Sequence, residues 1–67
     1  MGKPQFTITV GTTSGQDFRV RSAQPEHDAR DILRATSPVL LTLTNGDEAL
    51  VRPERVEFVS YETTAPL

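Results

Sequence analysis

The sequence predicts a small α+β domain in which one short helix packs on a mostly antiparallel sheet. Residues 5–10 and 17–21 alternate between polar and apolar side chains, which is typical of half-buried strands. The Asn45-Gly46 pair lies between two apolar runs and favours a β-hairpin with a two-residue type I′ turn. Between these β regions, residues 25–36 carry apolar side chains at helical spacing. We therefore expect a single domain, residues 1–67, with the element order β-β-α-β-β-β, which is also compatible with a β-grasp order.

The first two predicted strands form a hairpin whose apolar side chains share one face. Small, turn-favouring residues at positions 11–16 connect the strands and predict a loop. The side chains expected to face the core are those of Phe6, Ile8, Val10, Phe18 and Val20. The opposite face carries threonines and arginines, as expected for a sheet with one solvated side.

A helix is predicted to begin at Pro25 and to end near Thr36. Proline suits the first helical turn because its missing N–H is not needed there, and two acidic residues in that turn favour the helix dipole. Pro38 disfavours helical backbone at the residue before it, so the helix should stop there. The expected buried face comprises Ala29, Ile32, Leu33 and Thr36.

Two apolar runs, residues 39–44 and 47–52, are predicted to pair as the second hairpin. A two-residue turn between them would place Leu41 opposite Leu50 and Leu40 opposite Val51.

The last predicted strand covers residues 56–61 and follows Pro53, which interrupts the ladder because proline cannot donate to it. We expect Phe58 on its core face, and Val59 and Tyr61 on the other face. Whether this strand pairs with the fourth strand or the first stays open. Residues 1–4 and 62–67 are expected to be flexible, because they carry no periodic pattern.

The last three predicted strands carry apolar side chains on both faces. Such strands are buried on both sides, and one helix covers only one face of a sheet. We infer a second burial surface, provided by a second copy of the chain or by another protein. The expected interface residues are Leu40, Val51, Val59 and Tyr61. The alternatives are a C-terminal segment that folds back over the strands, and isolated apolar residues that are simply exposed.

These patterns predict a non-enzymatic protein-interaction or assembly module that self-associates through its C-terminal strands. The chain has no cysteine and one histidine, which excludes disulfides and thiolate metal sites and argues against structural zinc. Its net charge of −2 gives no overall attraction to nucleic acid or anionic membranes. No apolar run approaches the roughly 20 residues of a membrane span, and no signal peptide is recognised, so we expect a cytoplasmic protein.

No cluster of residues in the sequence points to catalysis, a cofactor or a metal. His27 and Asp31 are four residues apart on the predicted helix, but two ligands are too few for a metal site. The stretch 11–15 contains two glycines but lacks the lysine of a phosphate-binding loop. Asp47 and Glu48 flank a tight turn, where we expect solvated charges. We expect a protein that is not an enzyme and holds no cofactor or metal.

Four arginines support an alternative function. They are Arg19, Arg21, Arg52 and Arg55. If these side chains converge, they form a basic patch able to hold phosphate, and the protein would be a small regulatory nucleic-acid-binding protein. With the phenylalanines assigned to the core, only Tyr61 would be free to stack on a base. Exposed arginines on strands also protect sheet edges from aggregation, which is the more ordinary explanation.

Residues 41–59 resemble the core of FlbD-type flagellar accessory proteins. The shared pattern is a strand, Asn45-Gly46, a second strand, Pro53, and a last strand that begins with Val56-Glu57. The helix and the first hairpin have no counterpart in that family. Over residues 5–61, the layout resembles more closely a family of small actinobacterial proteins without an assigned function. The features shared with that family are structural, so the resemblance implies an element order and no catalytic residue.

Overall fold

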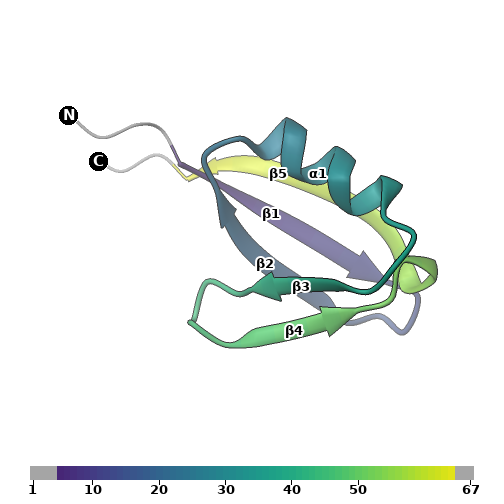
Figure 1. Ribbon diagram of the computed structural model, residues 1–67. Helices are drawn as coiled ribbons and strands as arrows, with labels where there is room; N and C mark the ends of the chain where they lie inside the picture. The colour runs from purple at the N-terminus through teal and green to yellow at the C-terminus, as the bar shows by residue number, and fades with distance from the viewer. Residues whose placement is uncertain (1–4, 65–67) are drawn as a thin grey trace.

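The computed structural model describes residues 5–64, which form one α-helix and five strands (Figure 1). The elements in chain order are β1 (Gln5–Thr12), β2 (Asp17–Ser22), α1 (Pro25–Arg34), β3 (Val39–Thr42), β4 (Glu48–Val51), the 3₁₀ turn η1 (Pro53–Arg55) and β5 (Val56–Thr64). The predicted α+β class and the order β-β-α-β-β-β are confirmed. Residues 62–64, expected in a flexible tail, continue β5 and pair with β1, whereas positions 1–4 and 65–67 lie outside the described residues.

The strands form a three-stranded sheet in the order β2-β1-β5 and a two-stranded hairpin, β3-β4. A bridge between Val20 and Leu43, with a 3.0 Å hydrogen bond from the Thr44 N–H to the Arg19 carbonyl, joins β2 to the start of the hairpin loop. The strands therefore follow one another in the order β5-β1-β2-β3-β4, and β4 and β5 lie at the two ends. The last strand pairs with the first, antiparallel.

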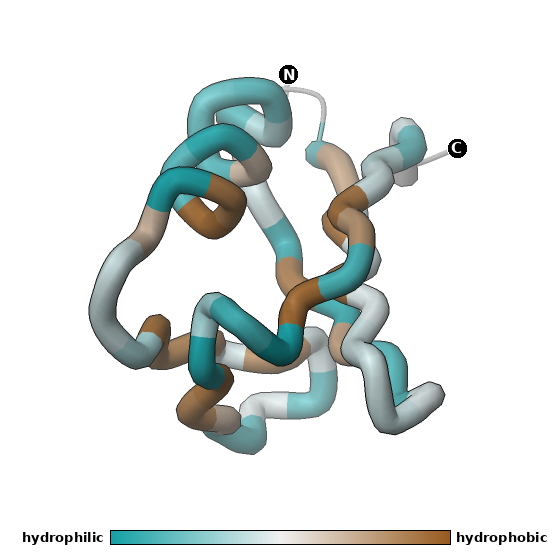
Figure 2. The backbone as a smooth tube through the Cα atoms, turned by 90° about the vertical axis from the view of Figure 1, so that its right-hand side faces the viewer, coloured by the Kyte–Doolittle hydropathy of each residue, from teal (hydrophilic) through white to brown (hydrophobic). Residues whose placement is uncertain are grey.

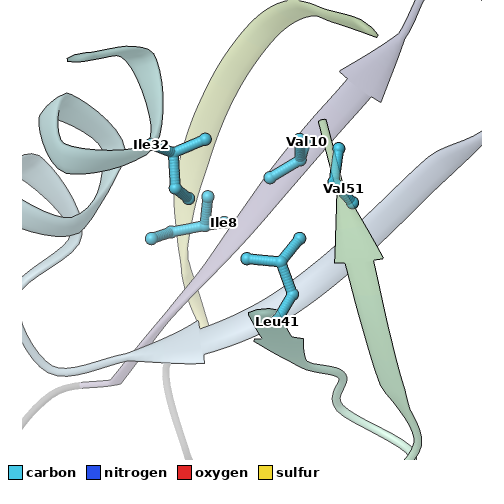
Figure 3. Close-up of a cluster of buried hydrophobic side chains, with 5 residues drawn as sticks. All are labelled: Ile8, Val10, Ile32, Leu41 and Val51. Carbon is cyan, nitrogen blue, oxygen red and sulfur yellow. The ribbon is translucent and has the colours of Figure 1, made fainter. Parts of the chain in front are cut away.

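The core lies where the inner face of the sheet meets α1 and the hairpin. Ile8 and Val10 of β1 are fully buried at its centre. Figure 3 shows their side chains pointing toward Ile32 of α1, Leu41 of β3 and Val51 of β4. Half-buried apolar side chains that pack around this cluster are Phe18, Val20, Val39, Leu43, Ala49, Val56 and Val59. The helix and all five strands thus contribute to one small core, which fits the limited apolar area that a chain of this size can bury.

The helix buries a narrow stripe made of Pro25, Ala29 and Ile32, at spacings of four and three residues. Its start is tied to β2, because the Ser22 hydroxyl donates a hydrogen bond to Asp28 and accepts one from the Gln24 N–H at 2.9 Å. The helix ends at Arg34, two residues before the predicted end. Leu33 is 58% exposed, so its prediction as a core residue was wrong. In this short helix the buried apolar side chains are the three of this stripe, while Asp28 reaches β2 through its hydrogen bond with Ser22.

The β3–β4 loop differs from the predicted two-residue turn. The Gly46 N–H donates to the Leu43 carbonyl at 2.9 Å, and the Leu43 N–H donates to the Asp47 carbonyl at 2.7 Å. These bonds enclose three residues, 44–46. Gly46 has a φ of +92°, whereas Asn45 does not have the positive φ that a type I′ turn requires. Asn45 instead accepts a hydrogen bond from the Asp47 N–H through Oδ1, at 2.9 Å, which is the Asx-turn role of this side chain.

The three-residue loop shifts the register of the hairpin by one residue from the prediction. Leu40 lies opposite Leu50, Leu41 opposite Ala49 and Val39 opposite Val51. Because directly opposed residues share a face, this register puts Val51 in the core and leaves Leu50 outside.

A second irregularity lies in the pairing of β1 with β5, where Gly11 faces Phe58 but Thr12 faces Val56, so that Glu57 is the extra residue. Val56 therefore packs against the core, whereas Phe58 lies opposite Gly11 on the outer face and is exposed. The prediction that Phe58 belongs to the core was wrong. Its ring covers Gly11 so closely that a Cβ there would lie 2.1 Å from the Phe58 Cε1 atom. A glycine in this strand thus allows the close approach of a neighbouring ring.

Replacing the central core residue is expected to destabilise the whole domain. Ile8→Ala removes buried methyl groups beneath both α1 and the hairpin, and substitutions of this kind cost about 2–5 kcal/mol. Urea denaturation followed by circular dichroism measures the loss. The matched control is Leu33→Ala, which we expect to change the free energy of unfolding by less than about 0.5 kcal/mol because Leu33 is exposed. Equal losses in the two variants would contradict this description of the core.

Candidate protein-interaction surface

The outer face of the β3–β4 hairpin carries two neighbouring leucines. Leu40 and Leu50 lie directly opposite each other and are 60% and 69% exposed. We call them the leucine pair. Thr42 and Glu48, the next opposed residues on this face, are also exposed. Figure 2 shows the hydrophobic stretches of the hairpin at the bottom of the molecule, away from the mostly hydrophilic helix. The leucine pair is therefore an exposed apolar surface bordered on the same face by polar side chains.

Beside the leucine pair lies a strand edge. β4 has β3 as its partner on one side, and no other described strand pairs with it. In an antiparallel ladder, hydrogen-bonded pairs of residues alternate with non-hydrogen-bonded pairs. Because Leu43 and Asp47 form a hydrogen-bonded pair, the odd-numbered residues of β4 point their backbone groups toward β3. The backbone groups of Glu48 and Leu50 therefore point to the open side. Even-numbered residues of the preceding strand point their backbone groups away from β4 for the same reason, and the Thr44 N–H accordingly donates to Arg19 of β2.

The four residues predicted for the interface do not form one surface. Leu40 is exposed as expected. Val51 is 7% exposed and belongs to the core, because the register differs from the predicted one. Val59 lies opposite Val10 and packs against the core, since it shares the inner face of the sheet.

Tyr61 lies apart from the hairpin, at the far end of β5. Its ring contacts that of Phe6 edge-on, with centroids 6.2 Å apart and planes at 85°. Together they border a groove of about 750 Å³ alongside α1. The other residues that line the groove are Gln24, Pro25, Glu26, His27, Arg30, Asp31 and Arg34. Tyr61 is thus accessible, but it belongs to the helix side of the molecule rather than to the leucine pair.

The four arginines form two separate pairs. Arg19 and Arg21 lie opposite Thr9 and Thr7 on the outer face of the sheet. Arg52 precedes η1 and Arg55 is its last residue, and both line a groove of about 280 Å³ that also includes Leu50 and residues of the β1–β2 loop. None of the grooves described for residues 5–64 contains all four.

The helix carries a polar cluster on its exposed side. The His27 Nδ1 atom lies 3.6 Å from a carboxylate oxygen of Asp28 and 3.4 Å from one of Asp31. Arg30 donates to Glu26 at 2.7 Å one turn away. The ligand-type atoms of His27 and the two aspartates lie within 4.8 Å of one another, yet the three side chains are largely open to solvent. This arrangement is a solvated helix face with pairs of opposite polarity four residues apart.

On the strands, sequence reasoning missed the exposure of Leu50 and Phe58, as it did that of Leu33 on the helix. For Leu50, the available signal was that Asn-Gly also fits a three-residue hairpin loop with glycine in the left-handed position. For Phe58, the signal was Gly11 within an otherwise regular strand, which marks a bulge or a close approach.

Comparison of this chain with family models, with curated proteins and with solved structures found no match. The resemblances described from the sequence therefore stay predictions. Within residues 5–64, α1 is too short and too polar to cross a membrane.

Two neighbouring substitutions test which side chain of β4 faces inward. Val51→Asp places a charge in the core without a partner, which is expected to cost about 3–5 kcal/mol and to abolish cooperative unfolding. Leu50→Asp places the same charge on the exposed face, and we expect its circular dichroism spectrum and cooperative thermal transition to persist. The opposite outcome would show that the hairpin has the register of a two-residue turn.

Proposed function

We propose that this protein is a non-enzymatic protein-interaction module that self-associates through its C-terminal strands. The observation that carries the proposal is the leucine pair, exposed beside the unpaired edge of β4. Burying a leucine side chain contributes about 1.5–3 kcal/mol, so removing both side chains from water on association is a substantial driving force.

The size of the core supports the same proposal. Among residues 5–64, the buried hydrophobic cluster consists of five residues, and small domains commonly gain stability from self-association. The residues around the leucine pair have the character of an interface rim. Thr42, Glu48 and Arg52 are polar and exposed, and they surround an apolar centre as in typical protein interfaces.

Removal of the leucine pair should weaken association without unfolding the chain. We expect the unmodified protein to show a concentration-dependent mass above that of one chain in light scattering after gel filtration. The double variant Leu40→Ser with Leu50→Ser should shift this equilibrium toward a single chain, because the apolar area buried on association is lost.

Leu33→Ser is the matched control, since it removes a leucine of similar exposure from α1. We expect its mass profile to follow that of the unmodified protein. A mass of one chain at every concentration of the unmodified protein would refute the proposed function.

The outer face of the sheet favours a second candidate, a small regulatory nucleic-acid-binding protein. Arg19 and Arg21 of β2 share this face with the exposed ring of Phe58 on β5, and a face that carries both cations and an aromatic ring can hold a phosphate and stack a base. Asp17 and Glu62 lie on the same face, opposite Gly11 and Thr7, and lower its positive potential. For this reason self-association remains the leading proposal.

Fluorescence anisotropy with a labelled single-stranded oligonucleotide tests the second candidate. Binding is expected at low salt, to weaken steeply as salt increases, and to be lost in Phe58→Ala and in the double variant Arg19→Gln with Arg21→Gln. The double variant Arg52→Gln with Arg55→Gln is the control, because those arginines lie elsewhere. Unchanged anisotropy at low salt would exclude this candidate.

A further inference from the structure

We infer that β4 pairs with the β4 strand of a second copy, antiparallel, about a two-fold axis beside Leu50. The inference rests on the proposed self-association and specifies the strand, the register and the residues in contact. Figure 1 shows β4 at the margin of the molecule, with β3 on one side.

The first argument is the direction of the backbone groups along β4. Glu48 and Leu50 point their N–H and C=O groups away from β3, as the hairpin bonds establish. Arg52 continues the extended backbone, with φ −79° and ψ 133°, so its N–H follows the same alternation. Its carbonyl already accepts a 2.9 Å hydrogen bond from the Arg55 N–H, and Pro53 ends the strand. The open edge is therefore short. It presents three outward-pointing backbone N–H donors, those of Glu48, Leu50 and Arg52.

The second argument is charge complementarity, which selects one register. If Leu50 lies opposite Leu50 of the second copy, Glu48 lies opposite Arg52 of the second copy, and the reverse pair forms by symmetry. Opposite charges in directly opposed positions stabilise a strand pair. Shifting the strands by one pair in either direction would place Leu50 opposite Glu48 or opposite Arg52. A shift of two pairs would place Glu48 opposite Glu48, or Arg52 opposite Arg52.

The third argument is the face on which these side chains lie. Opposed residues share a face, so Leu50 of both copies would meet on the outer face of the joined hairpins. Leu40 neighbours Leu50 on the same face, which extends the apolar row across four strands, two from each copy. The Glu48–Arg52 pairs would border this row on both sides, two residues along the strands from Leu50. The leucine pairs of the two copies thus form one continuous apolar strip, which the charged pairs border.

A two-fold pairing of this kind also limits the assembly to two copies. Each copy uses its β4 edge for the other, so the contact generates a dimer and leaves no β4 edge for a third copy. The short strand, its flanking charges and the proline that follows are features that protect sheet edges against unlimited pairing. In this chain they permit one register and one partner.

A single cysteine placed at the axis tests the geometry, since the natural chain contains none. In Leu50→Cys, the two Cα atoms would lie about 5.5 Å apart in a hydrogen-bonded antiparallel pair, within the range of a disulfide. We expect mild oxidation to give a covalent dimer. The matched control is Leu40→Cys, whose Cα atoms would be separated by three strand spacings, roughly 14 Å, and should not be bridged.

Charge reversal provides a second test that leaves Leu50 in place. Glu48→Arg sets arginine opposite Arg52 of the second copy, and Arg52→Glu sets glutamate opposite Glu48, so each single variant should dissociate at higher concentrations than the unmodified protein. The double variant Glu48→Arg with Arg52→Glu restores opposite charges and should recover association. Circular dichroism confirms that each variant is folded.

The outcomes separate this inference from the proposed function. A disulfide dimer in Leu50→Cys together with recovery in the double charge variant supports the inference. If the unmodified protein is a dimer by light scattering, but Leu40→Cys is bridged instead of Leu50→Cys, or neither is bridged, the copies associate in another way. The same holds if the double charge variant fails to recover. These results overturn the inference and leave the proposed self-association in place. If light scattering gives the mass of a single chain at every concentration, both the inference and the proposed function are overturned.

Discussion

The register of the β3–β4 hairpin depends on a loop of three residues, 44–46, closed by a glycine in the left-handed region. This register places Leu41 and Val51 against Ile8 and Val10, and so completes the core. It also places Leu40 and Leu50 together on the opposite face. Because side chains alternate along a strand, one residue more or less in the loop would exchange the buried and exposed sets. The burial of Leu41 and Val51 and the exposure of the leucine pair thus share one origin.

The central strand β1 has neighbours on both edges and on its inner face. It pairs with β2 on one side and β5 on the other, while α1 and the hairpin cover its inner face. Ile8 and Val10 are consequently fully buried in a domain with few core residues. On the outer face no helix is present within residues 5–64, and the side chains there are mostly threonine, arginine and acidic residues. The bulge beside Gly11 admits Phe58 as an aromatic exception.

The two ends of the strand order have different characters. β5 is long and lies next to α1, which contacts it along the inner face, whereas β4 is four residues long and carries the leucine pair. An edge strand presents unpaired backbone groups, and an exposed apolar face adds a hydrophobic gain to any strand that pairs there. The combination is why we place association at β4 rather than at Tyr61, which lies beside the helix.

Local patterns were sufficient for much of this fold. Alternation along residues 5–10 and 17–21, the proline at the start of the helix and the Asn-Gly pair are short-range signals, and each produced the expected element. The same signals were insufficient to predict which side chains of the hairpin are exposed. Asn45-Gly46 is compatible with a loop of two or three residues, and the difference moved Val51 into the core and Leu50 out of it. The choice depends on contacts with β1 and β2, residues distant in sequence whose packing no local pattern encodes.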